Sequence, residues 1–112
     1  MARRVRDLIF EVLRAAEIRY VFGNPGTTEL PFLDGFAHHP DIEYVTCLHE
    51  AVAVGGAMGY ALVSGKVGVV NLHAGPGLAH GLSNLYNASR ARIPLLITAG
   101  QPDTRYLVHE PI

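Results

Sequence analysis

The 112-residue sequence predicts a single α/β domain of three layers, in which a mostly parallel sheet carries helices on both faces. Segments with helical spacing of apolar residues alternate with short apolar segments rich in β-branched residues, and this alternation is typical of parallel strands joined by right-handed crossovers. Residues 67–72 are apolar almost throughout, as a parallel strand covered on both faces should be. Glycine-containing turns follow three of the four expected strands.

The first expected element is an amphipathic helix over residues 5–17. Its apolar residues recur every three or four positions with charged residues between them, which is the pattern of a helix with one buried face. The stripe that we expect to be buried consists of Val5, Leu8, Ile9, Val12, Leu13 and Ala16.

A short strand and a tight turn follow the first helix. Residues 20–22 are apolar, and Gly23-Asn24-Pro25-Gly26 ends the strand in a turn. Thr27 or Thr28 is then expected to cap a short second helix. Pro31 is tolerated in that helix because the first helical turn needs no internal hydrogen-bond donor.

The middle of the chain predicts a second strand over residues 43–48 and a third helix that starts at Glu50. Three glycines in this helix each destabilise it by about 1 kcal/mol relative to alanine. They are Gly55, Gly56 and Gly59. Such a sequence is justified where another element packs very closely, so we expect the third helix to be central and buried.

The last third of the chain continues the alternation. The strand at 67–72 is interrupted by residues 73–77, a fourth helix is marked by apolar residues from 78 to 86, and a fourth strand is expected at 94–99. No closing helix follows the turn at 100–103. We therefore expect the fourth strand to lack a covering layer and the domain to be incomplete at its C-terminus.

Charge and composition limit the classes of function. Nine basic and ten acidic side chains give a net charge of −1, which provides no basic surface for nucleic acid or for an anionic membrane. No apolar run reaches the ~18 residues of a membrane span, and we expect that the charged N-terminus is not a signal peptide. Cys47 is the single cysteine, so it forms no internal disulfide, and we expect a reducing, cytoplasmic location.

Two ionisable residues follow predicted strands at the edge where parallel α/β sheets bind ligands. Glu50 lies between a buried strand and an apolar helix, and shielding from water would raise the pKa of its carboxyl and suit it to proton transfer. The simpler alternative is a carboxylate stabilised by the helix dipole. His73 ends the third strand, and its simpler alternative is a structural histidine bonded to a carbonyl.

Other polar candidates also have ordinary structural explanations. Thr27 serves as a helix cap, and Asn24 closes an Asx turn. His80 lies near the start of the fourth helix, where we expect it to be exposed. His38 and His39 are expected in a solvated loop and are not candidates for a metal site, since the pattern places no third ligand near them.

Several well-known motifs are incomplete. Residues 75–77 lack the third glycine of a dinucleotide fingerprint, and neither glycine turn has the lysine of a phosphate-binding loop. His49 and Glu50 begin a zinc-protease motif, but Ala53 occupies the position of its second histidine. The serine elbow Gly-x-Ser-x-Gly does not occur. We therefore expect no metal ligand in this chain, and a flavin-binding domain of flavodoxin type stays a rival interpretation.

Four segments in order carry a resemblance to a known family. They are VFGNPGTTELPFLDGF, LHEAVAVGGAMGYA, VVNLHAGPGLAHGLSNLYNA and PLLITAGQ. The chain resembles, over nearly its whole length, the N-terminal pyrimidine-binding domain of thiamine-diphosphate-dependent 2-oxo-acid enzymes. The benzoylformate decarboxylase branch is the nearest and acetolactate synthase the next. The resemblance implies the thiamine-diphosphate-binding fold, with residues 1–112 as an incomplete pyrimidine-binding domain.

The resemblance also implies roles for particular residues. Glu50 matches the glutamate that hydrogen-bonds N1′ of the cofactor's pyrimidine, and His73 matches an acid–base histidine that also contacts substrate. Thr27 replaces a serine that contacts the substrate carboxylate. The residues whose backbone would line the pyrimidine are Pro25, Gly26 and Gly77.

The implied function is half of a 2-oxo-acid decarboxylase site that uses thiamine diphosphate and Mg²⁺. Family members hold the magnesium with a Gly-Asp-Gly motif in a diphosphate-binding domain of another subunit, and this sequence has no such motif. We therefore expect a homodimer or homotetramer of the complete enzyme and no catalysis by this chain alone. The Gly-Pro-Gly at 75–77 is more typical of acetolactate synthases. A carboligase half-site and a non-catalytic relic of such an enzyme stay as alternatives.

Overall fold

The computed structural model describes residues 3–109 and confirms the predicted α/β fold. Four parallel strands form one sheet in the order β2-β1-β3-β4. The strands are β1 (Tyr20–Asn24), β2 (Glu43–Thr46), β3 (Gly68–Leu72) and β4 (Leu95–Ala99). The helices are α1 (Val5–Ala15), α2 (Leu30–Phe36), α3 (Glu50–Ser64) and α4 (Ala74–Ala91), with short 3₁₀ turns η1 (Thr27–Glu29) and η2 (Leu107–His109).

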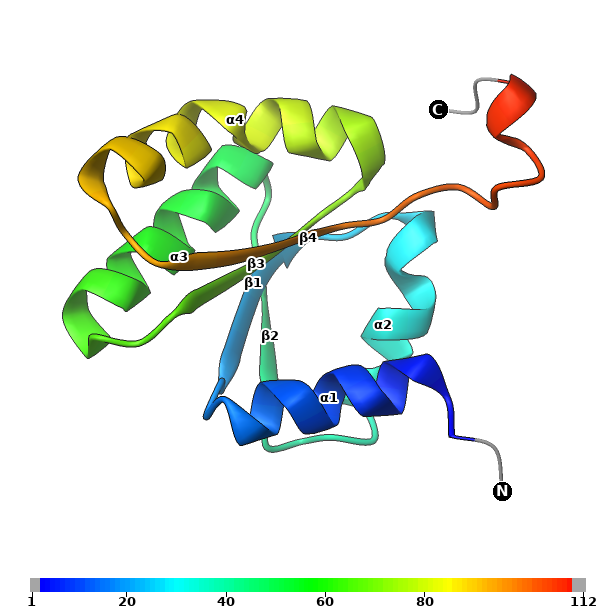
Figure 1. The fold of residues 1–112 in the computed structure, drawn as a ribbon, viewed down its shortest axis with the longest axis horizontal. Helices are drawn as coiled ribbons and strands as arrows, with labels where there is room; N and C mark the ends of the chain where they lie inside the picture. Colours follow the sequence, from blue (N-terminus) through cyan, green and yellow to red (C-terminus); the bar gives the residue numbers. More distant parts are fainter. Residues whose placement is uncertain (1–2, 110–112) are drawn as a thin grey trace.

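Helices cover both faces of the sheet, with α1 and α2 on one side and α3 and α4 on the other (Figure 1). Because successive strand residues point to opposite faces, two cores form. Val21 and Val69, which are paired across β1 and β3, lie in the core on the α1 side with Phe10 and Leu13. On the opposite face, Val70 lies in the core that α3 completes.

Helix α1 forms where predicted, but Leu13 is the one residue of its expected stripe that is buried. Phe10 and Leu13 are buried, whereas Val5 and Val12 are 72% and 67% exposed. Phe10 lies one position off the stripe, and its ring packs edge-on against Phe36 at 4.8 Å between centroids. This aromatic contact with α2 fixes the rotation of α1 about its axis, and the spacing of aliphatic residues alone does not reveal it.

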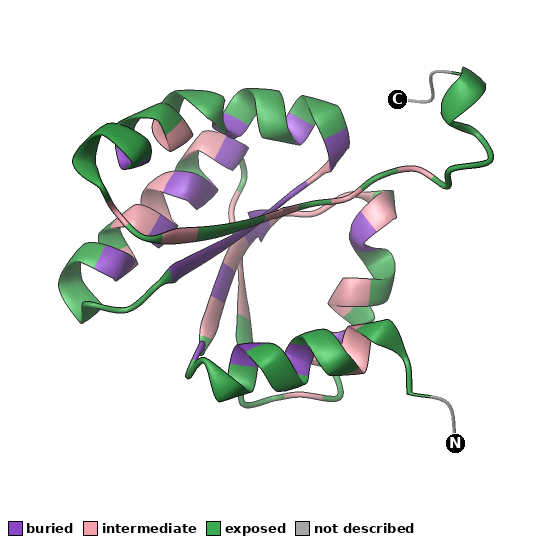
Figure 2. Cartoon of the chain, viewed as in Figure 1, coloured by how far each residue is buried: buried purple, intermediate pink, exposed green. Residues whose placement is uncertain are grey.

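Helix α3 lies against the sheet and beside α4, and it is buried on one face only (Figure 2). Ala53, Val54 and Ala57 are fully buried, while Val52 on the outer face is 61% exposed. Close packing explains one of the glycines, since a Cβ on Gly56 would lie 2.9 Å from the Phe22 ring. The expected central position of this helix is thus confirmed and its complete burial is not.

Two further features bear on the predicted elements, namely the exposure of β4 and the position at which α4 begins. Strand β3 is buried along its whole length, whereas Leu96 and Ile97 of β4 are 44% and 42% exposed, so the fourth strand does lack part of its cover. Helix α4 begins at Ala74, and its first turn therefore includes Gly-Pro-Gly at 75–77. Proline is compatible with that turn because its missing N–H has no helical partner there. None of the helices described here is long and apolar enough to cross a membrane.

Alanine substitutions at two glycines of α3 should have opposite effects. A Cβ on the exposed Gly59 meets no atom within 4 Å, so Gly59→Ala should raise the free energy of unfolding by about 0.5–1 kcal/mol. Gly56→Ala should lower it by about 1 kcal/mol, because overpacking against Phe22 outweighs the gain in helix propensity. Urea unfolding of both variants measures the difference, and equal stabilisation by the two substitutions would contradict the close approach of α3 to β1.

Candidate functional site

The candidate site lies at the carboxyl ends of β1 and β3. From β1 the chain passes through α2 to β2 on one side, while β3 pairs with β1 on the other. In open α/β sheets such a reversal of strand order opens a crevice that binds ligands. The structure places Asn24, Glu50 and His73 at this reversal, each at the end of a strand or the start of a helix.

Glu50 is the first residue of α3, and its burial is confirmed, since only 6% of it is exposed. Its Oε1 accepts a hydrogen bond of 3.1 Å from Asn24 Nδ2. Its Oε2 lies 3.2 Å from Nδ1 of His80 on α4. A Cβ on Gly77 would lie 3.4 Å from Oε1, so the glycine leaves one side of the carboxylate uncovered by any side chain. Asn24 therefore orients the carboxylate, a contact that the Asx-turn interpretation did not include.

The pKa of Glu50 differs from the sequence-based expectation. Burial acts to raise this pKa, as expected. Hydrogen bonds from the helix backbone, from Asn24 and from His80 outweigh burial, so the pKa lies below its ordinary value. The expectation of a raised pKa was wrong because the two side-chain donors, which are distant in the sequence, were not predicted. In this structure Glu50 is an anion at neutral pH.

A second buried carboxylate, Glu29, holds His73. Glu29 ends η1 and is 3% exposed. Its Oε2 accepts the Gly26 N–H at 2.8 Å and lies 2.9 Å from His73 Nδ1, while the hydroxyl of Thr28 donates to Oε1. Burial acts to raise the pKa of Glu29, but these hydrogen bonds and the nearby His73 hold it below its ordinary value. The ionised carboxylate can only accept, so Nδ1 of His73 carries the proton.

Glu29 was not predicted from the sequence, and the predicted helix cap is wrong. The N-cap of α2 is Glu29 and not Thr27 or Thr28, both of which lie within η1. The Glu29 side chain accepts the N–H of Gly26, which precedes η1. A glutamate three residues after a turn residue is the spacing of a capping box, and this signal could have identified Glu29. Thr27 itself is exposed at the start of η1, next to the residues that contact His73.

The turn after β1 and the turn after β3 touch each other closely. A Cβ on Gly26 would lie 2.3 Å from the His73 ring, so only glycine fits beside this histidine. Directly after His73, Ala74 adopts a φ of 45°, a left-handed conformation that turns the chain sharply from β3 into α4. The structure thus brings together Gly26, Glu50, His73 and Gly77, all of which were candidates from the sequence.

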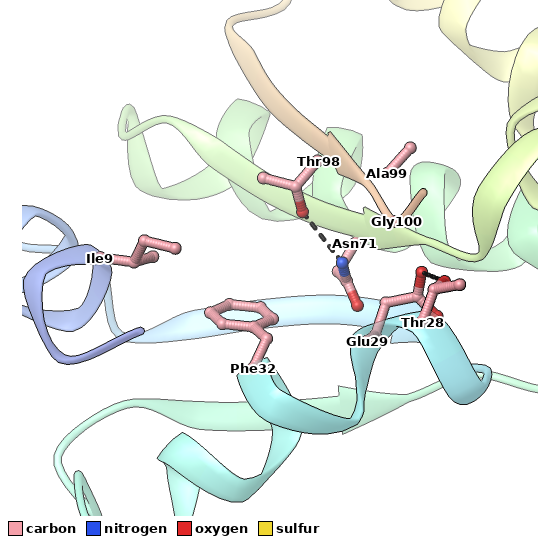
Figure 3. Close-up of a pocket in the computed structure, with 8 residues that line it drawn as sticks. All are labelled: Ile9, Thr28, Glu29, Phe32, Asn71, Thr98, Ala99 and Gly100. Atoms are coloured by element: carbon pink, nitrogen blue, oxygen red, sulfur yellow. Dashed lines mark hydrogen bonds between the residues drawn. The ribbon is translucent and has the colours of Figure 1, made fainter. Parts of the chain in front are cut away.

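A cavity of about 160 Å³ lies on the face of the sheet that α1 and α2 cover (Figure 3). Ile9 and Phe32 form its apolar wall, and Glu29 closes its end beside Thr28. Asn71 contributes to the lining and is 3% exposed; its Nδ2 donates to Thr98 Oγ1 at 3.0 Å. This asparagine lies within an otherwise apolar strand, and it was not predicted as a buried polar group.

Comparisons with known proteins agree with this architecture. Residues 3–112 match the family described as "Thiamine pyrophosphate enzyme, N-terminal TPP binding domain". Benzoylformate decarboxylase of Pseudomonas aeruginosa is 46% identical over 99 residues, which are 88% of this chain and 18% of that protein. The acetolactate synthase large subunit of Lactococcus lactis is 35% identical over 95 residues, 85% of this chain and 16% of that protein.

A solved structure has the same fold. The thiamine diphosphate-dependent 4-hydroxybenzoylformate decarboxylase of Rhodococcus jostii superposes with a TM-score of 0.92 and 40% identity. The match covers 98% of this chain and 20% of that chain. The chain therefore spans about a fifth of the length of the relatives it matches.

Replacement of Glu29 should change how stability depends on pH. Because folding lowers the pKa of Glu29, its contribution to stability is present above pH 4.5 and is lost as the pH falls through the folded-state value. Glu29→Gln should lower the free energy of unfolding by about 1–3 kcal/mol at pH 7, and the difference should narrow below pH 4.5. Urea titrations at several pH values measure this, with the exposed Glu43→Gln as a control that changes little. A Glu29→Gln variant as stable as the parent at pH 7 would contradict the network.

Proposed function

The chain belongs to the thiamine pyrophosphate enzyme family as its N-terminal TPP binding domain, and on this premise we propose that it is the pyrimidine-binding half of a 2-oxo-acid decarboxylase site. The cofactor of this family is thiamine diphosphate. The 46% identity to a benzoylformate decarboxylase supports a decarboxylase of that type. In this proposal residues 1–112 form an N-terminal pyrimidine-binding domain that needs further protein to complete its site.

The buried carboxylate of Glu50 is the observation that carries the proposal, and its surroundings fit a pyrimidine ring. A side chain at position 77 would approach Oε1 to 3.4 Å, whereas glycine leaves that space to a ligand. A carboxylate held by Asn24 offers a fixed hydrogen-bonding partner for a ring nitrogen. We assign to Glu50 the contact with N1′, and to the backbone of Pro25, Gly26 and Gly77 the lining of the ring. Bound thiamine diphosphate would supply the electron sink for the loss of carbon dioxide.

Glu50 would hold a proton shared with N1′ at the buried end of the ring. Water would compete for that proton, and the 6% exposure of Glu50 limits its access. A carboxylate that is anionic in this structure can accept a hydrogen bond from a ring nitrogen that carries the proton, when that nitrogen replaces one of its present donors. This exchange of partners is the acid–base function that the geometry allows.

His73 would act on the substrate. Nδ1 of His73 lies 2.9 Å from Oε2 of Glu29 and 3.1 Å from Oγ1 of Thr28. These two oxygens can accept its hydrogen, so the proton stays on Nδ1. The other ring nitrogen, Nε2, then has a lone pair that can take up a proton. Thr27 would contact the carboxylate of a small 2-oxo acid with its hydroxyl group.

A carboligase half-site of acetolactate synthase type is the second candidate. The Gly-Pro-Gly at 75–77 and the 35% identity to an acetolactate synthase favour it. In both cases a diphosphate-binding domain from another subunit would hold Mg²⁺ and complete the site in a homodimer or homotetramer. Assays of the complete enzyme with several 2-oxo acids, thiamine diphosphate and Mg²⁺ separate the two, because one releases an aldehyde and the other a longer keto acid. The isolated chain should show no turnover.

Loss of the carboxylate should abolish cofactor activation. In the complete enzyme, Glu50→Gln should lower the rate about 10²–10⁴-fold, as is usual when general acid–base help is removed. The direct measurement is hydrogen–deuterium exchange at C2 of bound thiamine diphosphate, which should slow by a similar factor while circular dichroism stays unchanged. Exchange at the parent rate would refute the contact with N1′.

Two adjacent threonines should separate substrate binding from proton transfer. Thr27→Ala should raise KM for a 2-oxo acid about tenfold or more, because a hydrogen bond to a charged carboxylate is lost. Thr27→Ser is the matched control and should keep KM near the parent value. Thr28→Ala removes a partner of Glu29 and His73 and should change kcat and its pH profile instead. An unchanged KM in Thr27→Ala refutes the assigned carboxylate contact.

A further inference from the structure

We propose that His49, Glu50 and His80 form a binding site for a divalent transition metal of the Zn²⁺ class. His49 is the N-cap of α3, Glu50 follows it, and His80 comes from the second turn of α4. One ligand atom from each residue lies within 4.8 Å of the other two. The two imidazole rings stack with their centroids 5.1 Å apart and their planes 25° from parallel.

The separations suit tetrahedral coordination after a small movement. With metal–ligand bonds of 2.0–2.1 Å, neighbouring ligand atoms in a tetrahedral zinc site lie roughly 3.3 Å apart. Glu50 Oε2 and His80 Nδ1 are already 3.2 Å apart. His49 has to approach them, and its side chain is exposed. The His80 side chain is 59% exposed, so a water molecule can reach the fourth position.

The ligand set selects the class of metal. Two imidazoles and one carboxylate suit Zn²⁺, Ni²⁺ or Cu²⁺ better than Mg²⁺ or Ca²⁺, which prefer oxygen ligands. The positive end of α3 opposes a cation here, and the anionic Glu50 offsets that field. Asn24 Nδ2 would keep its hydrogen bond to Oε1 of Glu50 and orient the carboxylate, as hydrogen-bonding partners of metal ligands commonly do.

Metal binding requires a change at His49. Its Nδ1 accepts the N–H of Ala51 at 3.1 Å, so in the neutral ring Nε2 carries the proton. A metal that binds at Nε2 displaces that proton to Nδ1, which then releases the Ala51 N–H to solvent. The affinity should therefore be moderate.

The cluster differs from the zinc-protease motif that the sequence begins and does not complete. His49 and Glu50 start the zinc-protease pattern, and Ala53 stands where its second histidine would lie on the same helix. In the structure Ala53 is buried in the core, and the second histidine is His80, which comes from a different helix and lies beside Glu50. Glu50 would be a ligand here, whereas the glutamate of the protease motif is a general base. The catalytic zinc sets of known hydrolases include two histidines and one glutamate, which is the set found here.

The site has a regulatory consequence, which rests on the proposed function. Glu50 cannot bind a metal through Oε2 and also serve the cofactor's N1′, since Asn24 already uses Oε1. Zn²⁺ would therefore compete with thiamine diphosphate for this half-site. The metal would inhibit, whereas the family's magnesium would assist binding at the diphosphate.

Calorimetric titration of the 112-residue chain with ZnCl₂ at pH 7.5 tests the site itself. We expect one equivalent to bind, and His80→Ala and His49→Ala should each weaken binding at least tenfold. His38→Ala is the matched control; it removes an exposed histidine far from the site and should change the affinity by less than twofold. Equal affinities for the parent and His80→Ala, or an equal loss in His38→Ala, would overturn the proposal. His80 is exposed, so its replacement does not threaten the fold.

Competition is tested on the complete enzyme at fixed Mg²⁺. In the parent, Zn²⁺ should raise the apparent Kd for thiamine diphosphate, which is measured by fluorescence quenching. In His80→Ala, the same rise in Kd should need at least tenfold more Zn²⁺. If the chain binds Zn²⁺ at this cluster but Zn²⁺ does not compete, the metal site stands and the assignment of Glu50 to the pyrimidine fails. If the chain binds no Zn²⁺ while Glu50→Gln still stops cofactor activation, the metal site fails alone.

Discussion

The whole site depends on one constraint, which is that two carboxylates must stay ionised after they leave water. Glu50 lies on the α3 side of the sheet and Glu29 on the α2 side, and burial alone would favour the neutral form of each. The end of β1 and the turn after it supply a donor to both, through the side chain of Asn24 and the backbone of Gly26. This short turn therefore links the two faces of the sheet at the point where the strand order reverses.

Local patterns predicted most of the fold because they are enough to define the elements. The periodicity of apolar residues and the glycine turns predicted four strands and four helices near their observed positions. The apolar segment at 67–72 indicated a strand that is buried on both faces. The rotation of α1 was not predictable in this way. It depends on how the ring of Phe10 meets the aromatic residues of α2, which is a contact between elements and not a property of either one.

Only part of the site was predicted, because local patterns do not reveal contacts between distant elements. Glu50 and His73 were found because residues at strand ends in a parallel sheet converge. Their partners were not predicted, because they are distant in the sequence: Glu29 lies 44 residues from His73, and His80 lies 30 residues from Glu50. The start of α4 matters here: because the helix begins at Ala74, Gly77 and His80 come one turn apart on the side that faces Glu50.

The contacts of Glu50 imply that a ligand must compete for it. In this structure both carboxylate oxygens are engaged, one by Asn24 and one by His80. Asn24 lies in the sheet, whereas His80 is exposed on α4, so the contact with His80 is the one a ligand can displace at lower free-energy cost. A heterocycle that brings its own nitrogen replaces His80 and leaves the asparagine in place. A metal ion instead keeps His80 and recruits His49, so the position of one imidazole ring decides between the two occupants.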